Sequence, residues 1–392
     1  MTTVRTGVHH ARMPPGALEG LLVADFSRVL AGPLCTMTLG DLGADVVKVE
    51  RPGTGDDSRG WGPPYAGDGT ATYYLGLNRN KRSVVLDLDD ASDVVLAQRL
   101  AARADVVVGS FRPGLMARWG LDHATLAAEN PQVVSCSITA FGSGEAGAAL
   151  PGYDLLVQAM SGLMSVTGEP GPEGRPLKVG AAVIDMLCGL YASTGILAAL
   201  AERTRTGRGQ HVEVSLMDTA LNALLNQASA FLNAGVVGTR MGNQHPSVAP
   251  YGTFRAADGD LAVAVGNDAI FRRLCTALGR PELGADSSYA TNAARVANRE
   301  ALDAELQRRF AGRPAAEWVA ALTAAGVPAG PINDVAQAFA LAGALGLDPV
   351  DEIGGVRTVR SPLRLSQTPA TVARCPPALG EHDADIRAWL AR

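Results

Sequence analysis

One aspartate, Asp185, is the residue whose surroundings point most directly to chemistry. It is the only charged residue in the apolar segment 181–201. An ionised carboxylate in such surroundings costs several kcal/mol unless hydrogen-bond donors satisfy it. In one interpretation Asp185 caps the start of a helix and accepts bonds from its first free N–H groups. In the other, the same geometry keeps the carboxylate ionised at neutral pH, as a nucleophile requires, and Gly189 leaves one side of the helix open to close approach.

Other residues that could line a ligand site accompany Asp185. Tyr153 and Asp154 follow a Pro-Gly break, so we expect Asp154 to begin a helix and Tyr153 to form an amphipathic wall of a cleft, although ordinary structural roles explain both. Segment 242–246 is either a mobile lid or an ordinary turn between domains. Basic residues expected in loops around the strand ends would suit a phosphorylated ligand unless they are merely solvated: Arg28, Arg51, Arg59, Lys81 and Arg82.

The chain does not carry the motifs of the common cofactor sites. Residues 142–147 match GxGxxG, but Pro151 and Gly152 follow at once and leave no room for the helix that a dinucleotide site requires. There is no P-loop, HExxH or GxSxG, and the six histidines have no ligand spacing. The five cysteines form no CxxC pair, which indicates reduced thiols in a cytoplasm and no zinc site. We therefore expect no metal and no tightly bound cofactor.

The composition is that of a globular protein with two or three domains. The chain has 392 residues, of which 47% are hydrophobic and 19% charged, and its net charge is −5. These values exclude a disordered chain and argue against partners such as nucleic acid or an anionic membrane. Segment 179–201 is apolar enough to raise the question of a membrane span, but Asp185 and many small residues favour a buried helix. Residues 1–16 lack an apolar signal core and are expected to form a loose arm.

Alternating strand and helix patterns must position these residues. Helices are expected after Ser27 and at 91–104 and 123–130, and strands at 21–26, 45–50, 83–88, 105–111, 132–141 and from 211. Short β-branched runs separated by helices indicate parallel βαβ units. The predicted fold class is therefore α/β, with a Rossmann-like sheet whose ligand sits at the carboxyl ends of the strands.

The chain pattern also predicts an interrupted large domain. We expect its first part at 17–221, a smaller α+β domain at 222–335 with a hairpin at 253–266, and a return segment at 336–392 that completes the large domain.

The chain contains nine motifs in this order: VADFSRVLAGPLCTMTLGDLGADVVKVERPGTGDDSR, NKRSVVLDL, SFRPG, GYD, the apolar segment of Asp185, ERTRTGRGQHVEVSLMD, GNQHPSVAPYGTF, GVPAGPINDV and PPALGEH. Together they resemble the motifs of the class III (family III) CoA-transferases. The resemblance covers residues 17–392, and the superfamily includes formyl-CoA transferase, carnitine CoA-transferase and α-methylacyl-CoA racemase. Its members are interlocked homodimers of a Rossmann-like large domain and a small domain. The resemblance implies the same architecture here, with the active site between domains and subunits.

The resemblance also implies covalent catalysis by Asp185. In the family's transferases an aspartate of this helix attacks the acyl-CoA thioester and then carries CoA as an aspartyl-CoA thioester. The substrate pocket and the glycine-rich flap that shields the intermediate correspond to Tyr153, Asp154, Gly242, Asn243, Gln244 and His245. The CoA contacts correspond to Arg28, Val29, Leu30, Ala31, Arg51, Leu86, Asp87, Phe111 and Arg118. Ser110 and Asp89 depart from the family pattern, which leaves the position of the 3′-phosphate of CoA open.

Racemisation and simple acyl-CoA binding are the alternatives to CoA transfer. The racemases use a histidine in a GHD motif, where this chain has Gly152-Tyr153-Asp154, and tyrosine with an ordinary pKa of about 10 is a poor base. Transfer is therefore favoured over racemisation, and a non-catalytic acyl-CoA-binding protein is the alternative of another class. The flap sequence GNQHPSVAPY resembles that of members acting on short dicarboxylates such as succinate. The expected partners are a second copy of the chain, acyl-CoA as substrate and a small carboxylic acid, in the cytoplasm.

Overall fold

The computed structural model describes residues 16–392, which form two compact units. The first unit comprises 16–162, Val179–Leu232 and Asp348–Arg392, and the second comprises Leu163–Lys178 and Asn233–Leu347. The predicted arm, 1–16, lies outside the described residues except for Gly16.

The boundaries of the second unit differ from those of the predicted small domain, 222–335. The unit begins later because α10 (Leu216–Ala223) packs against α9 (Val183–Thr206) of the first unit. It ends later because it includes α16 (Val335–Ala344), and it also takes in 163–178, which we expected in the large domain.

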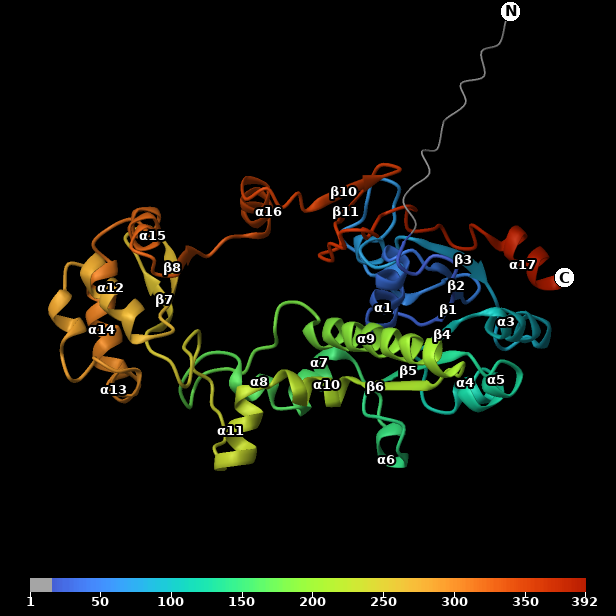
Figure 1. Cartoon of the computed structure of the whole chain (residues 1–392), viewed down its shortest axis with the longest axis horizontal. Helices are drawn as coiled ribbons and strands as arrows, with labels where there is room; N and C mark the ends of the chain where they lie inside the picture. Colours follow the sequence, from blue (N-terminus) through green and yellow to red (C-terminus); the bar gives the residue numbers. More distant parts are fainter. Residues whose placement is uncertain (1–15) are drawn as a thin grey trace, which may run out of the picture. The chain divides into compact units, whose positions relative to one another are not determined.

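A six-stranded parallel sheet forms the centre of the first unit (Figure 1). Its order is β3-β2-β1-β4-β5-β6, and the strands are β1 Leu22–Phe26, β2 Asp45–Glu50, β3 Lys81–Val85, β4 Val106–Gly109, β5 Val134–Thr139 and β6 His211–Ser215. Val23 of β1 pairs with Val46 on one side and Val106 on the other. The predicted parallel α/β sheet is confirmed, and its order reverses between β1 and β4 as in doubly wound folds.

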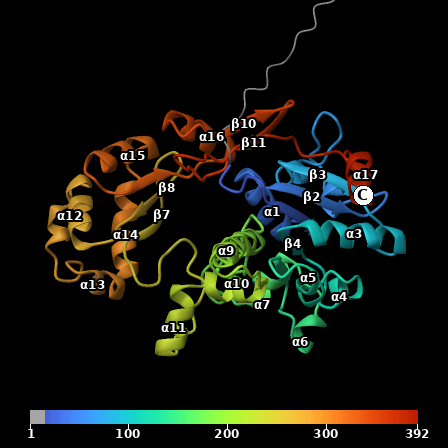
Figure 2. The same ribbon diagram turned by 45° about the vertical axis from the view of Figure 1, so that its right-hand side comes forward.

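Helices cover both faces of this sheet. Phe26 of β1 faces a core shared with α3 (Ala91–Arg103), α5 (His123–Glu129) and α17 (Asp383–Ala391), which lie together in Figure 2. Asp25, one residue earlier, points to the opposite face, where α1 (Ala31–Asp41) packs, because successive side chains of a strand alternate. The remaining helices of the unit are α2 Thr72–Leu75, α4 Leu115–Arg118, α6 Glu145–Ala148, α7 Asp154–Met160, α10 and α11 Asn226–Ala234, which crosses the border at Leu232.

The long apolar helix α9 is the central helix of the first unit. It packs against α1, β5 and β6, so the helix that we expected to be buried is buried on one face, while Met186, Leu190 and Tyr191 are exposed. By length and composition alone it is the one helix among residues 16–392 that could span a membrane. It ends at Gly207, whose φ of +70° places it in the left-handed region that closes helices.

The last part of the chain returns to the first unit. Ile386 and Leu390 of α17 are buried in the core beside α3, and Arg387 pairs with Asp93 at 2.8 Å. The return segment also contains a separate two-stranded hairpin, β10 Val350–Ile353 and β11 Val356–Val359.

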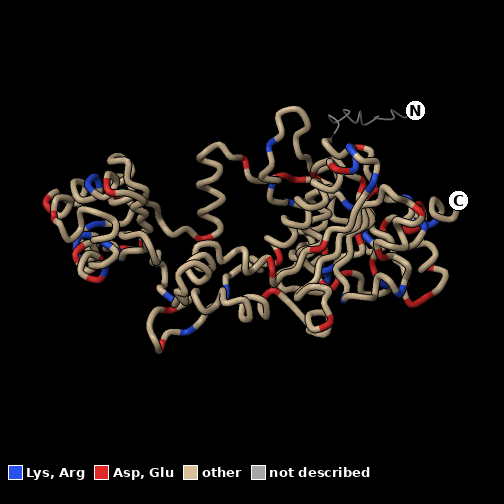
Figure 3. Tube along the Cα trace, turned by 60° about the horizontal axis from the view of Figure 1, so that its bottom comes forward, with Lys and Arg blue, Asp and Glu red and all other residues tan. Residues whose placement is uncertain are grey.

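The second unit is a small α+β body with its own core. The predicted hairpin is present as β7 Tyr251–Arg255 and β8 Asp260–Ala264, which β9 Ala329–Pro331 extends. Its core contains Phe254, Phe271, Phe310 and Trp318. The helices are α8 Leu163–Val166, α12 Asp268–Ala277, α13 Asn292–Ala297, α14 Arg299–Phe310, α15 Ala315–Ala324 and α16. Acidic and basic residues are interspersed in each unit (Figure 3).

Candidate functional site

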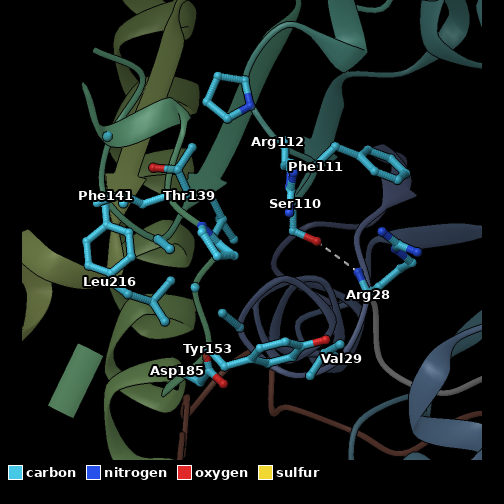
Figure 4. A pocket seen from close by; sticks show the side chains of 18 of the residues that line it. Arg28, Val29, Ser110, Phe111, Arg112, Thr139, Phe141, Tyr153, Asp185 and Leu216 are labelled. Atoms are coloured by element: carbon cyan, nitrogen blue, oxygen red, sulfur yellow. Dashed lines mark hydrogen bonds between the residues drawn. The ribbon is translucent and has the colours of Figure 1, made fainter. Parts of the chain in front are cut away.

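A pocket of about 270 Å³ lies at the carboxyl ends of β1, β4 and β5 in the first unit (Figure 4). The loops after these strands and the starts of α7, α9 and α10 form its walls. The lining includes Arg28, Val29, Leu30, Ala31, Asp57, Ser110, Phe111, Arg112, Thr139, Phe141, Tyr153, Asp185 and Leu216. Because strand order reverses between β1 and β4, the pocket occupies the place where doubly wound sheets bind ligands.

The pocket brings together several predicted site residues that lie far apart in the chain. Residues 28–31, Phe111, Tyr153 and Asp185 all line it. Arg112, Thr139 and Phe141 also line it and were not predicted. The signal that could have found them is their position just after the carboxyl ends of β4 and β5.

Asp185 lies in the first turn of α9, but it is not the residue that caps this helix. The N-cap position is Ala182, whose side chain makes no capping bond. The interpretation of Asp185 as an N-cap is therefore wrong, and its carboxylate faces the pocket instead.

A second aspartate, Asp154, caps α9 from a different helix. Asp154 begins α7, as predicted, and its side chain is buried. Its Oδ1 accepts bonds from the N–H groups of Ile184 at 2.9 Å and Asp185 at 3.2 Å. Its Oδ2 accepts a bond from Gln158 Nε2 at 2.5 Å, and Gln158 Oε1 accepts one from the N–H of Val179 at 2.9 Å. Asp154 thus caps the start of α9 and does not line the pocket.

The pKa of Asp185 is well above that of an ordinary aspartate. Burial raises it to about 7, and the negative charge of Asp154 adds to the rise. We expected a helix start to keep this carboxylate ionised at neutral pH, but burial and the charge of Asp154 raise its pKa, and Asp154 rather than Asp185 accepts bonds from two N–H groups of the first turn. Near pH 7 the group is divided between its acid and its carboxylate.

Gly189 brings α9 close to α1, as expected from its position one turn after Asp185. A Cβ atom at Gly189 would lie 2.6 Å from the carbonyl oxygen of Ala31. The absence of a side chain therefore lets the start of α1 approach α9. Ala31 and Asp185 consequently line the same pocket.

Tyr73 is a neighbour of Asp185 that the sequence did not reveal. Burial raises the pKa of Tyr73 to about 12, and the negative charges of Asp185 and Asp154 add to the rise. Its hydroxyl therefore stays protonated, and its ring packs edge-on against Trp61 with centroids 5.2 Å apart. No local pattern distinguishes this tyrosine from the one that follows it.

Two of the predicted basic residues share one carboxylate at the pocket. Arg28 lies over the ring of Phe111 at 5.0 Å and pairs with Asp57 at 3.7 Å. Arg51 donates a hydrogen bond to the same Asp57. Both arginines are partly exposed, so an anionic ligand can reach them.

The other three basic residues are engaged elsewhere. Arg59, Lys81 and Arg82 pair with Glu50, Asp25 and Asp45, respectively. Lys81 and Arg82 lie in β3 rather than in a loop, and Lys81 is fully buried. The expectation that they lie in loops around the strand ends is therefore wrong for these two.

Four predicted CoA contacts lie outside the pocket lining: Arg51, described above, and Leu86, Asp87 and Arg118. The side chain of Leu86 is 1% exposed and packs in the sheet core, so it does not face a ligand. Asp87 Oδ1 accepts a bond from the N–H of Asp89 at 3.0 Å, and Arg118 lies 4.0 Å from the Asp89 carboxylate on the surface.

The flap residues belong to the second unit and are held there by side-chain bonds. Gly242 has a φ of +61°, and Asn243 Nδ2 donates to Thr253 Oγ1 at 3.1 Å. Gln244 Nε2 donates to Asp303 Oδ2 at 2.6 Å. His245 Nδ1 accepts a bond from the N–H of Ser247. The motif therefore rests on β7 and α14, and its role as a lid stays a prediction.

The described residues do not assemble a metal or dinucleotide site. No three His, Cys, Asp or Glu side chains of residues 16–392 are grouped to hold a metal. In the GxGxxG segment α6 is a single turn, and a Cβ at Gly147 would lie 2.0 Å from the carbonyl oxygen of Phe141. The helix that holds a pyrophosphate is therefore not formed.

Comparisons with known proteins agree over nearly the whole chain. The family model described as CoA-transferase family III matches residues 18–383. A succinate–glutarate CoA-transferase of Agrobacterium fabrum is 43% identical over 97% of this chain and 96% of its own. An acetyl-CoA:oxalate CoA-transferase of Acetobacter aceti is 40% identical over 90% of each chain. The crystal structure of a CAIB/BAIF family protein from Brucella suis superposes with a TM-score of 0.85 at 44% identity, covering 96% of this chain and 100% of that one.

Proposed function

The chain belongs to CoA-transferase family III, and we propose that it moves CoA from an acyl-CoA thioester to a carboxylic acid through an aspartyl-CoA thioester on Asp185. The observation that carries this proposal is the carboxylate of Asp185, which lines a pocket at the ligand-binding end of the sheet with a pKa of about 7.

The reaction begins and ends with Asp185 as a free carboxylate. One of its oxygens attacks the thioester carbon, the C–S bond breaks, and a mixed anhydride and CoA thiolate form. The thiolate attacks the carbonyl carbon of Asp185, which releases the donor acid and leaves the aspartyl-CoA thioester. The acceptor carboxylate attacks that thioester, giving a second anhydride and thiolate. Attack of the thiolate on the acceptor's carbonyl carbon makes the new acyl-CoA and frees Asp185.

The walls of the pocket suit these steps. The start of α1, at Leu30 and Ala31, lines the pocket, and its N-terminal N–H groups have no side-chain cap. Such groups stabilise the negative oxygen of a tetrahedral intermediate and the anionic parts of a ligand. Burial around Asp185 keeps water, a competing nucleophile, from the anhydride.

We further propose short dicarboxylic acids as the donor and acceptor acids, with succinyl-CoA as a donor. The relatives named above include enzymes of succinate, glutarate and oxalate, and the flap sequence GNQHPSVAPY supports the same class. A panel of acetyl-, succinyl- and branched acyl-CoA donors against mono- and dicarboxylates tests this choice. Faster exchange with monocarboxylates than with dicarboxylates would contradict it.

Intact-protein mass spectrometry tests the intermediate. After incubation with succinyl-CoA, the wild type should gain a CoA adduct at Asp185, and Asp185→Ala should show neither adduct nor exchange while still binding CoA. Asp218→Ala is the matched control, because Asp218 lies in the first turn of the neighbouring helix α10. Exchange at wild-type rate by Asp185→Ala would refute the assignment, and binding without exchange by the wild type would leave a non-catalytic acyl-CoA-binding protein.

We also propose that the protein is an interlocked homodimer. Large apolar side chains are exposed on α7, α9, α10 and α11 and around them, at Leu155, Leu156, Met160, Met186, Leu190, Tyr191, Leu221, Leu225, Phe231 and Leu232. Soluble monomers rarely expose so many apolar groups on neighbouring elements. Light scattering after gel filtration should give twice the chain mass of 40.5 kDa, and a monomer at micromolar concentration would contradict the proposal.

The cysteines support a cytoplasmic location. All five are free thiols, and burial raises the pKa of Cys35 and Cys188 to about 12, which makes them inert. Fractionation of the source cells tests the location.

A further inference from the structure

The backbone of residues 27–29, which enters the pocket after β1, is held by three side chains from β2 and from the loops after β2 and β4. Lys48 Nζ of β2 donates to the carbonyl oxygen of Ser27 at 2.9 Å. Ser110 Oγ, after β4, accepts a bond from the N–H of Arg28 at 3.0 Å (Figure 4). Asp56 Oδ1 accepts a bond from the N–H of Val29 at 3.2 Å.

Val29 requires such support because its backbone is strained. Its φ is +73°, in the left-handed region that β-branched residues seldom occupy. A conformation of this kind persists only where the surroundings determine it, and such residues gather at functional sites. This left-handed conformation turns the chain so that α1 begins, at Leu30 and Ala31, in the wall of the pocket.

Two of the three supports are a single buried ion pair. Lys48 Nζ lies 2.8 Å from Asp56 Oδ2, and both side chains are 0% exposed. Asp56 also accepts bonds from the N–H and the hydroxyl of Ser58, which fixes its orientation. Burial by itself lowers the pKa of Lys48, but the charges of Asp56, Asp25 and Glu50 raise it above its usual value, so the lysine stays charged.

We propose that the buried Lys48–Asp56 pair is a positioning device for CoA transfer, which holds Val29 in its left-handed conformation so that the start of α1 faces the pocket of Asp185. Lys48 donates a hydrogen bond to the carbonyl oxygen of Ser27, and Asp56 accepts one from the N–H of Val29. The ion pair therefore fixes the backbone on both sides of Arg28. Neither Lys48 nor Asp56 lines the pocket, so both act through the backbone of residues 27–29. The inference rests on the proposed function, because it takes this pocket as the acyl-CoA site.

A rescue experiment separates positioning from general stability. Asp56→Ala removes the acceptor for Val29, and we expect kcat/KM for succinyl-CoA to fall about ten- to a hundredfold, with weaker CoA binding. Glycine adopts φ values near +70° without strain, so adding Val29→Gly to Asp56→Ala should restore a large part of the loss. Asp56→Asn, which keeps a side-chain oxygen, should show a smaller loss and the same rescue, and it serves if the alanine variant does not fold.

The control is an ion pair of the same kind away from the loop. Asp41 pairs with Arg79 at 2.6 Å, both largely buried, so Asp41→Ala perturbs stability similarly. Val29→Gly should not rescue it. The inference is overturned if Val29→Gly raises kcat/KM of neither Asp56 variant, or if it raises kcat/KM of Asp41→Ala by the same factor. Calorimetry of CoA binding measures the same rescue by Val29→Gly without turnover. Its outcome therefore does not depend on whether the wild type forms the adduct at Asp185.

Discussion

Replacing Asp185 by asparagine should stabilise the protein, and increasingly so at higher pH. The pKa of Asp185 is about 7 in the folded chain against an ordinary 3.8, so between these values the folded chain holds a proton that the unfolded chain has released. The wild type therefore loses stability as pH rises from about 4 to about 7. Asparagine has the shape of the protonated acid and does not titrate, so the variant escapes this loss.

The size of the effect follows from the shift in pKa. About three pKa units correspond to roughly 4 kcal/mol once both states are ionised. At pH 5 only about 2 kcal/mol of this loss has accrued, so the advantage of the variant should widen by roughly 2–3 kcal/mol between pH 5 and pH 8.

Thermal unfolding at several pH values measures this change. The difference in Tm between Asp185→Asn and the wild type should grow by roughly 5 °C from pH 5 to pH 8 for a unit of this size. Asp89→Asn is the control, because it removes a carboxylate from the surface of the same unit and should give a small difference at every pH. A difference for Asp185→Asn that stays constant or narrows would refute the account of a buried, partly protonated carboxylate.

Three further results are expected. The kcat for transfer should rise with pH and level off above about 7, because only ionised Asp185 attacks. Asp154→Asn should move the midpoint of this rise to lower pH, because it removes the neighbouring negative charge. A midpoint that does not move would contradict this account. Gly189→Ala should lower the Tm by several degrees, since its Cβ would lie 2.6 Å from a carbonyl oxygen of α1, whereas Gly144→Ala, which has open space, should leave the Tm unchanged. Asp25→Asn should cost about 3–5 kcal/mol in urea unfolding because it strands a buried lysine, and a loss below 1 kcal/mol would argue against that pair.

The elements that carry the site could be predicted because their patterns are local. The run DVVKVE is rich in β-branched valine, which favours a strand, and ASDVVLAQRLAARA has the spacing of a helix on its surface. The alternation of such runs implies a parallel sheet, and the carboxyl ends of its strands are where the pocket lies. Asp185 stood out for an equally local reason, as one charge in an apolar helix.

The properties of that aspartate could not be predicted, because they arise from groups distant in sequence. Asp154 lies thirty-one residues earlier, yet it takes the N–H groups that we assigned to Asp185 and helps to raise its pKa. The partner of a buried charge depends on which helices pack together, and a one-dimensional pattern does not encode that choice.

The sequence by itself determined the parallel sheet, the apolar helix and the single acid within it, because hydrophobic periodicity and charge are properties of neighbours. Tertiary structure decided the rest. It buried Lys81, which we expected in a loop, as the partner of Asp25, and it placed Val29 in a left-handed turn held by hydrogen bonds between the backbone and the side chains of Lys48 and Asp56. Burial and long-range pairing set the charge state and direction of a side chain, and both exist only once the chain has folded.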